Sequence, residues 1–243
     1  MKNTAIIIPT RLKASRFPNK PLVKINNIPM IIHVVNRAKE SKVGEVFVAT
    51  PDKEIFNIVN KNGNKAILTN QEHSSGSDRI YEAYSKKLKN NFDLIINLQG
   101  DMPNIKPNAI LKLEKFMRSN SCDIGTLASH IRDENEITNP NVVKVHVEEK
   151  LKKDNFLKAK DFFRIKKTLS IKEIYHHIGI YAFTSVALTK YVSLSRSKLE
   201  IERNLEQMRA MENNLIIKVG LCDSNPLGID TEQDLTKVRK EMN

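Results

Sequence analysis

The stretch AIIIPTRLKASRFPNKPL, residues 5–22, joins an apolar run to a loop that is rich in basic side chains and prolines. The run has the length and β-branched composition of a buried strand. The basic side chains of the loop are Arg11, Lys13, Arg16 and Lys20. Like charges repel one another unless an anion lies among them. The stretch therefore predicts a first strand that ends in an anion-binding loop.

Short β-branched runs alternate with longer amphipathic stretches along the chain, which is the pattern of repeated βαβ units. Strands are predicted at 4–10, 45–50, 65–69, 93–100, 123–131, 142–147, 176–183 and 216–222. Helices are predicted at 29–41, 53–62, 76–88, 107–119, 199–213 and 231–242. The fold class is therefore α/β, with a mostly parallel central sheet flanked by helices.

Residues 148–175 interrupt this pattern, because they are strongly charged and only weakly periodic. We interpret this segment as an excursion from the sheet. The chain shows no internal repeat and no low-complexity linker. One domain over residues 1–243, carrying an insertion near 148–175, is therefore preferred over two domains.

The net charge of +12 raises the alternative of a basic nucleic-acid-binding protein. The lysines are, however, spread along the chain and interleaved with asparagines, and no nucleic-acid-binding motif accompanies them. Neither a membrane span nor a signal peptide is recognisable, so we expect a cytoplasmic protein without nucleic-acid or membrane partners. Cys122 and Cys222 match no disulfide or zinc pattern and are interpreted as buried small hydrophobic residues.

The loop after the first strand is a candidate phosphate site. Ligands of open α/β sheets gather beyond the carboxyl ends of the strands, where this loop begins. Arg11, Arg16 and Lys20 can converge there on a polyphosphate. Neither GxxxxGK[ST] nor GxGxxG is present. A solvent-exposed basic loop without a ligand is the alternative that the residue types leave open.

Two aspartates follow predicted strands. Asp101 comes directly after the strand at 93–100, and Asp230 stands in a similar setting far along the chain. Mg²⁺ is usually held by one or two carboxylates together with substrate phosphate. The alternative for each is a turn or helix-capping role, since Asp230 or Thr231 can cap the last helix. Asp234, one turn into that helix, is interpreted as a surface acid or as an acid that the helix dipole favours.

The segment PTRLKASRFPNKPL, residues 9–22, resembles the signature P-[AT]-R-x-x-S-x-R-[LF]-P-x-K-P-L of the cytidylyltransferases that activate 3-deoxy-manno-octulosonate (Kdo) as CMP-Kdo. Further segments in the order of that family are SSGSDR (74–79), NLQGDMP (97–103), NPNVVKV (139–145) and GIDTEQDL (228–235). The resemblance implies a Rossmann-like nucleotidyltransferase fold and a homodimer. It also implies CTP and Kdo as substrates, Mg²⁺ as cofactor, and a role in lipopolysaccharide biosynthesis.

The resemblance also implies roles for individual residues. The implied nucleotide-binding residues are Arg11, Arg16, Lys20, Ser75, Gly76 and Ser77. The implied catalytic residues are Lys20, Arg16, Asp101 and Asp230, and the metal is placed on Asp101 and Asp230. The loop would then hold CTP, and no covalent protein nucleophile is required.

The sugar acid needs a cation and hydrogen-bonding side chains. The residues that the resemblance suggests are Gln99, Arg164, His177, Tyr181, Glu206 and Gln207. His177 and Tyr181 are four apart in a predicted strand, so both point to one face, although ordinary strand residues would do the same. Glu206 and Gln207 diverge by about 100° on a helix, so one of them can be structural.

The chain departs from the family pattern in places. Met102 stands where relatives commonly carry an acid or amide after the central aspartate. Arg164 is the best counterpart for a contact with the sugar carboxylate. The same chemistry on 8-amino-Kdo or a nonulosonic acid therefore remains open, as does an inactive scaffold, against which intact Lys20, Asp101 and Asp230 argue.

Overall fold

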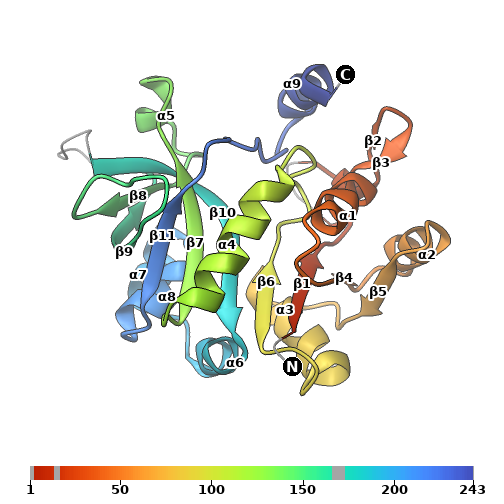
Figure 1. Ribbon diagram of the computed structural model, residues 1–243. Coiled ribbons are helices and arrows are strands. Elements are labelled where there is room, and N and C mark those ends of the chain that lie inside the picture. Colours follow the sequence, from red (N-terminus) through yellow and green to blue (C-terminus); the bar gives the residue numbers. More distant parts are fainter. Residues whose placement is uncertain (1–2, 14–16, 166–172, 243) are drawn as a thin grey trace. The chain divides into compact units, whose positions relative to one another are not determined.

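The computed structural model describes residues 3–13, 17–165 and 173–242, and Arg16 lies outside them (Figure 1). The sequence favours one domain, whereas the structure clusters into two compact units. Unit 1 comprises Met1–Leu111 with Pro226–Asn243, and unit 2 comprises Lys112–Asn225. None of the helices in the described ranges combines the length and the apolar character that crossing a membrane requires.

The strands of unit 1 run in the order β5–β4–β1–β6, and each neighbouring pair is parallel. They are β1 (Thr4–Pro9), β4 (Glu45–Thr50), β5 (Lys65–Leu68) and β6 (Leu94–Asn97). Every residue of β1 is buried. Parallel strands covered on both faces read as continuous apolar runs. The predicted parallel sheet is thus confirmed in unit 1.

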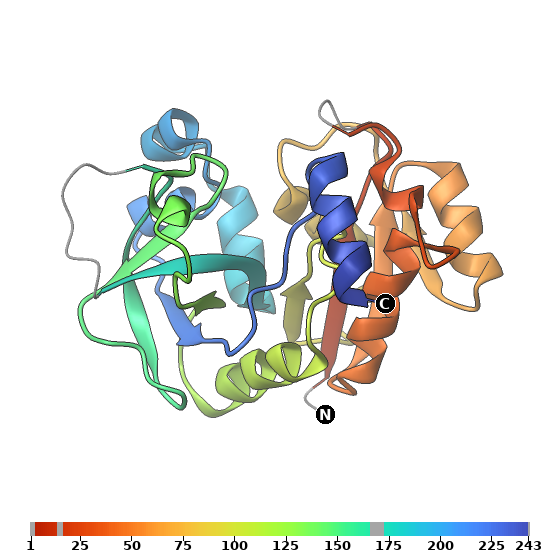
Figure 2. The same ribbon diagram turned by 90° about the horizontal axis from the view of Figure 1, so that it is seen from above.

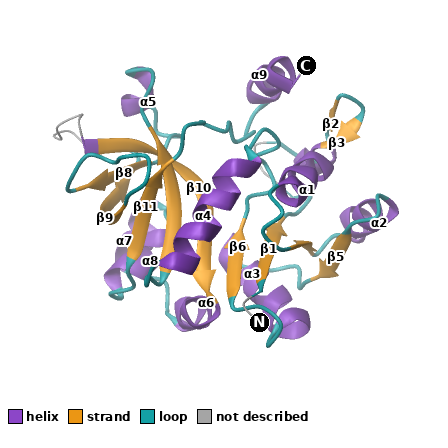
Figure 3. Ribbon diagram, in the orientation of Figure 1, coloured by secondary structure: helices purple, strands orange, loops and turns teal. Residues whose placement is uncertain are grey.

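Helices alternate with the strands of unit 1 along the chain. Figure 3 colours the helices purple and the strands orange. These helices are α1 (Met30–Glu40), α2 (Lys53–Lys61), α3 (Gly76–Ala83), the π-helix η2 (Tyr84–Leu88) and α9 (Glu232–Met242). A short 3₁₀ helix, η1 (Lys20–Leu22), precedes the hairpin of β2 (Lys24–Ile25) and β3 (Ile28–Pro29). The predicted helices of this unit therefore form with bounds close to those expected.

The last helix of the chain packs against the segment that follows the basic loop. Leu235 and Val238 of α9 form a buried cluster with Ile25, Met30 and Ile229. Figure 2 shows α9 alongside the segment that contains β2, β3 and α1. Burial of these side chains joins residues that are more than 190 positions apart in the sequence. It places the loop at 228–231 near the start of the chain. Residues 222–230 form no strand, so the prediction that Asp230 follows a strand is wrong, and the packing of Ile229 positions it instead.

The strand pairings of unit 2 form a closed ring, β10–β7–β11–β9–β8–β10. Its strands are β7 (Ile124–Ser129), β8 (Lys144–Val147), β9 (Phe156–Phe163), β10 (Ile174–Thr184) and β11 (Ile217–Leu221). Only β7 and β11 are parallel among these pairs of the described strands. The sheet of unit 2 is therefore mainly antiparallel.

The helices of unit 2 lie mostly in its C-terminal half. They are α5 (Asn135–Thr138), α6 (Ser185–Ser193), α7 (Lys198–Arg203) and α8 (Gln207–Glu212). Helix α4 (Pro107–Ser119) contains the residues at which unit 1 ends and unit 2 begins. Helix α6 is not among the predicted helices; it begins where the Thr184 side chain accepts a hydrogen bond from the Ala187 amide.

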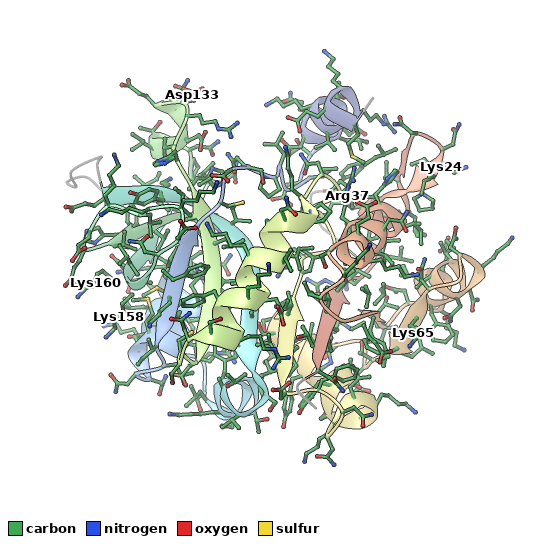
Figure 4. All side chains as sticks on the ribbon, in the orientation of Figure 1. Lys24, Arg37, Lys65, Asp133, Lys158 and Lys160 are labelled. Atoms are coloured by element: carbon green, nitrogen blue, oxygen red, sulfur yellow. The ribbon has the colours of Figure 1, made fainter. Side chains whose placement is uncertain are left out.

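The interpretation of residues 148–175 as an excursion from the sheet is wrong for 156–163. This part forms β9, which pairs with both β8 and β11. Lys158 and Lys160, labelled in Figure 4, are exposed, whereas Ala159 between them is buried. The charged residues of this segment, with lysines on the exposed positions, hid the pattern that marks a half-buried strand.

The single helix predicted at 199–213 is broken. Helix α7 ends at Asn204, whose φ of 52° and ψ of 49° lie in the left-handed region. Asparagine is one of the few residues that adopt this conformation readily, and it ends helices for that reason. The chain then restarts as α8 at Gln207. Apolar periodicity continues across the break, so periodicity alone predicted one helix.

Candidate active site

The basic loop is fastened to the end of the parallel sheet. The Thr10 amide donates to the carbonyl of Ala49, and the Leu12 amide donates to Asp52 Oδ2 at 2.8 Å. Asn19, with φ at 58°, donates from its amide to the Leu12 carbonyl. The last of these bonds holds Asn19, directly before Lys20, beside Leu12. The loop therefore begins and ends at fixed points beside β1 and β4.

Lys20 joins the two aspartates that the sequence singles out. Its Nζ lies 2.9 Å from Asp101 Oδ2 and 3.2 Å from Asp230 Oδ1. Two carboxylates within hydrogen-bond distance of one ammonium group are close enough for a single cation to bridge them. The structure thus brings together three of the predicted catalytic residues, all of them in unit 1.

The backbone determines where both carboxylates lie. A Cβ on Gly100 would lie 3.1 Å from the Pro9 carbonyl oxygen, closer than most Cβ atoms come to a neighbour, so glycine suits the close passage of the chain before Asp101. The Ile229 amide donates to the Asp101 carbonyl at 3.0 Å, which ties the two aspartate loops together. Ile229 is itself buried in the cluster around α9. The buried Ile229 therefore helps to fix the position of both aspartates.

The start of α9 supports the position of Asp230. The Thr231 hydroxyl accepts from the Asp234 amide, while Asp234 Oδ2 accepts from the amides of Asp230 and Thr231. This is a reciprocal cap, in which an acid at the third helical position returns the bond of the capping residue. The predicted cap by Thr231 is confirmed. Asp234 does more than lie on the surface, since it orders the backbone of Asp230.

Lys20 remains charged in this setting. Burial alone lowers the pKa of Lys20, but the charge of Asp101 and its hydrogen bond, together with those of Asp230, raise the pKa above its ordinary value. The carboxylates are partly exposed, at 28% for Asp101 and 41% for Asp230.

Carboxylate oxygens are donors that Mg²⁺ prefers, so the chemistry of Asp101 and Asp230 fits such an ion. Within the described ranges, no group of three or more His, Cys, Asp or Glu side chains could hold a metal ion. A metal at this site therefore needs further oxygen ligands from substrate or water.

A pocket of about 580 Å³ lies beside the basic loop in unit 1. Its lining includes Arg11, Lys13, Gln71, Glu72, His73 and Ser74. The pocket thus combines two cations from the loop with polar groups from the segment before α3. A cavity with these groups can take an anionic ligand that also carries hydrogen-bonding atoms.

The predicted nucleotide residues at 75–77 form the start of α3. Ser75 caps the helix, because its Oγ accepts from the Asp78 amide at 3.2 Å. A Cβ on Gly76 would lie 3.4 Å from Pro9 Cγ and 3.8 Å from Gln99 Oε1. The Ser77 side chain is buried and accepts a bond from Asn97. Gln99, predicted on the sugar side, therefore lies beside Gly76, in unit 1.

Sequence reasoning gave no role to three residues that hold the pocket lining. Arg79 donates to Thr69 Oγ1 and to the carbonyls of Asn70 and Gln71. Glu82 accepts from the Asn70 amide and pairs with His73. Both residues lie one to two turns into α3, and Arg79 closes the motif SSGSDR, which was a usable signal.

Asp52 is the third of these residues, since it accepts from Leu12 in the basic loop. It lies two residues after the end of β4 at Thr50. Burial, followed by the nearby charge of Arg11, lowers the pKa of Arg79. Arg11 and Arg79 are therefore close enough to repel each other, which an anion between or beside them would relieve.

In unit 2, His177 and Tyr181 share one face of β10, as predicted. Their ring centroids lie 5.3 Å apart, although the pairing with β7 shifts between Ile178 and Tyr181. His177 is buried, and Nε2 lies 3.0 Å from Thr126 Oγ1. Burial, and to a lesser degree the charge of His176, lowers the pKa of His177 to about 3. The ring is therefore neutral at physiological pH.

Glu206 and Gln207 stand at the start of α8, where Glu206 is the capping residue and Gln207 the first helical residue. The Tyr191 hydroxyl donates to the Glu206 carbonyl at 2.8 Å. A buried ion pair supports the same helix, since Arg209 donates twice to Glu200. The Gln207 residue is buried, so the two residues have different surroundings, as their divergence on a helix predicts.

Arg164 follows β9 in unit 2. Its guanidinium donates to the carbonyls of Pro140 and Asn141, within the motif NPNVVKV. Burial, followed by the charge of Arg164, lowers the pKa of Lys144. The predicted sugar-side residues Arg164, His177, Tyr181, Glu206 and Gln207 all belong to unit 2.

Similarity to known proteins extends over nearly the whole chain. A cytidylyltransferase family model matches residues 5–218. The 3-deoxy-manno-octulosonate cytidylyltransferase of Bartonella bacilliformis is 42% identical, over 97% of this chain and 96% of the relative. The enzyme of the same name from Brucella anthropi is 44% identical, over 97% and 95%.

Comparison with solved structures gives a result that agrees with these relatives. A CMP:2-keto-3-deoxy-manno-octonic acid synthetase, solved in complex with CTP, has a TM-score of 0.89 at 36% identity, covering 99% of this chain and 98% of that one. A 4-diphosphocytidyl-2C-methyl-D-erythritol synthase from Anaerococcus prevotii has a TM-score of 0.68 at 14% identity, covering 99% and 98%. At that identity the second likeness shows the fold alone.

The parallel α/β sheet, with a basic loop and paired acids beyond the ends of its strands, defines a protein of the nucleotidyltransferase class. The family model and the relatives above 40% identity narrow this class. The chain belongs to the 3-deoxy-manno-octulosonate cytidylyltransferase family.

Proposed function

We propose that this chain transfers CMP from CTP to Kdo and releases pyrophosphate. The observation that carries the proposal is the joining of Asp101 and Asp230 by Lys20, directly after the basic loop. Relatives at 42% and 44% identity bear the name of this activity. The product would serve lipopolysaccharide biosynthesis, as the resemblance implies.

In the proposed reaction the anomeric hydroxyl of Kdo attacks the α-phosphorus of CTP. A bond forms between the sugar oxygen and phosphorus, the bond to the β-phosphate oxygen breaks, and the hydroxyl proton passes to solvent. Lys20 and Arg16 would neutralise the pyrophosphate as it leaves, while Arg11 and the segment Ser75–Ser77 would hold the nucleoside. Holding two reactants in attack geometry can lower a barrier by roughly 7–11 kcal/mol.

We propose Mg²⁺ as the cofactor, held by Asp101 and Asp230. Their convergence on one ammonium group and their oxygen donors support this assignment. When bound, the ion would polarise the α-phosphate and assist deprotonation of the attacking hydroxyl. Lys20 would then turn from the carboxylates towards the phosphates.

The sugar-side roles remain predictions from the resemblance. Gln99, His177, Tyr181 and Glu206 would offer hydrogen bonds to the hydroxyl groups of Kdo, and Gln207 would do so where it is accessible. Arg164 would pair with the sugar carboxylate. An 8-amino-Kdo or a nonulosonic acid is the alternative acceptor.

Pyrophosphate release across a substrate panel tests the proposal. CTP, UTP, ATP and GTP are each combined with Kdo, 8-amino-Kdo or N-acetylneuraminate in the presence of MgCl₂. We expect release with CTP and Kdo. Equal rates with all nucleotides would refute cytosine selection, and release with another acid alone would transfer the proposal to that acid.

Asparagine substitutions separate the metal site from general charge effects. Asp101→Asn and Asp230→Asn are expected to lower turnover by about 10²-fold or more, which is typical for loss of one electrostatic stabiliser. Asp154→Asn, on an exposed turn of unit 2, is the matched control and should be unchanged. Wild-type rates in Asp101→Asn would remove that residue from the site.

We also propose a homodimer in the cytoplasm, on the strength of the resemblance. Light scattering during gel filtration is expected to give twice the chain mass of 27.8 kDa. A mass of one chain would contradict the dimer. If pyrophosphate release fails and the chain instead binds DNA with an affinity that falls steeply with salt, the nucleic-acid alternative replaces the enzyme.

A further inference from the structure

Thr126 lies in the middle of β7 and is fully buried. Its Oγ1 has three polar neighbours on β10. They are His177 Nε2 at 3.0 Å, the Ile180 carbonyl at 2.7 Å and the Ile178 carbonyl at 3.3 Å. These neighbours surround the point at which the register of the two strands shifts. The Thr126 hydroxyl thus bridges β7 and β10 where their regular pairing is interrupted.

The proton count at this hydroxyl decides the state of the histidine. A threonine hydroxyl has one hydrogen and two acceptor lone pairs. Carbonyl oxygens only accept, and the Ile180 carbonyl at 2.7 Å has the usual distance for an O–H···O bond, so the hydrogen goes there. The bond to His177 therefore needs its hydrogen from the ring, and Nε2 is the donor.

The surroundings keep the ring neutral and in place. Burial lowers the pKa of His177 to about 3, so a second ring proton is absent at neutral pH. Phe162 lies edge-on with its centroid 5.1 Å from that of the ring, and Tyr181 lies 5.3 Å away. A neutral ring that donates from Nε2 has an unprotonated Nδ1, which is an acceptor.

We infer that Thr126 is a positioning residue that holds His177 as the Nε2–H tautomer, so that Nδ1 accepts a hydrogen bond from a hydroxyl group of the sugar-acid substrate. The second half of this inference rests on the proposed function. The first half concerns the free protein and stands without it. A merely structural Thr126 would close the register shift without affecting how the protein binds the sugar acid.

Long-range ¹H–¹⁵N correlation spectra of the whole chain, labelled at histidine and free of substrate, test the tautomer at pH 7. His177→Gln assigns the signals by their loss. We expect Nε2 to appear protonated and Nδ1 unprotonated in the wild type and in Thr126→Ser, which keeps the hydroxyl. A protonated Nδ1 in the wild type would overturn the inference, whether or not the chain makes CMP-Kdo.

Thr126→Val removes the hydroxyl at nearly constant volume, and Thr189→Val, on the exposed face of α6, is the matched control. In Thr126→Val we expect a protonated Nδ1 population and a rise of about tenfold in KM for the sugar acid, as for loss of one hydrogen bond. KM for CTP should stay unchanged, and Thr126→Ser should restore the sugar KM. An unchanged sugar KM in Thr126→Val, with turnover intact, would overturn the substrate contact.

If Thr126→Val does not fold, the wild-type and Thr126→Ser spectra still decide the tautomer. If no substrate combination gives pyrophosphate, the proposed function fails while the tautomer result remains valid. The two failures are therefore distinguishable.

Discussion

Replacement of His177 by glutamine should change how the stability of the protein depends on pH. The histidine is buried, at 7% exposure, and its pKa is lowered from 6.5 to about 3, first by burial and then by His176. Glutamine can donate to the Thr126 hydroxyl but does not titrate. The substitution thus keeps a hydrogen bond and removes a proton-binding group.

The sign follows from where protons bind. Below pH 6.5 the unfolded chain protonates at His177, whereas the folded chain does not until pH falls to about 3. The unfolded state binds more protons in this window, so the free energy of unfolding falls as pH falls. From pH 7 to pH 5 the loss due to His177 is about 2 kcal/mol, at about 1.4 kcal/mol for each pH unit well below 6.5.

Urea unfolding at pH 7 and pH 5, followed by circular dichroism and tyrosine fluorescence, measures this loss, since the chain contains no tryptophan. Carboxylates and other histidines also titrate, so the quantity of interest is the difference between wild type and variant. We expect the decrease in unfolding free energy to be about 2 kcal/mol smaller in His177→Gln.

His130→Gln, in which an exposed histidine of the same unit is replaced, is the control and should keep the wild-type decrease. An equal decrease in wild type and His177→Gln would refute the reasoning. The ring would then titrate in the folded protein near its ordinary pKa, and the buried neutral histidine would be wrong.

Three further substitutions test contacts described above for Lys20, Gly100 and Glu200. Lys20→Met removes the cation between two partly exposed carboxylates and should lower the urea unfolding free energy by about 1 kcal/mol; MgCl₂ should stabilise this variant more than the wild type, and an equal response would contradict a shared ion. Gly100→Ala forces a Cβ to 3.1 Å from a backbone oxygen and should cost about 1–3 kcal/mol, whereas Gly228→Ala, with no described atom within 4 Å, serves as control and should unfold as the wild type does. Glu200→Ala removes the carboxylate to which the buried Arg209 donates twice and should cost about 3–5 kcal/mol in thermal or urea unfolding, part of which Arg209→Met on the same background should recover; no recovery would mean that packing alone is lost.

Local pattern was sufficient for most of unit 1. The strands at 4–9, 45–50 and 94–97 are apolar runs because both faces of a parallel sheet are covered. Each strand is followed by a turn and an amphipathic helix, so the order of elements could be predicted without knowledge of the contacts between them. The position of Asp101 shortly after β6 followed from the same signals, whereas the strand predicted before Asp230 ends at Leu221, well before it.

Unit 2 was less predictable because its determinants are not periodic. β9 carries lysines on its exposed positions, and the helix after 198 ends at one left-handed asparagine. Neither the alternating lysines of β9 nor the single asparagine after α7 produces a local sequence pattern from which the structure could be predicted. The bond between Thr126 and His177 depends on a register shift, which no count of residues along β10 reveals.

By itself the sequence determined the alternation of strands and helices in unit 1, the basic loop after the first strand and the aspartates at the ends of later segments. Those properties depend on neighbouring residues and on which side chains avoid water. Only the tertiary structure decided that Lys20 meets Asp101, 81 positions away, and Asp230, 210 positions away. These contacts depend on how distant segments pack. Burial of Ile229 and its neighbours, rather than any local preference, places Asp230 beside Asp101.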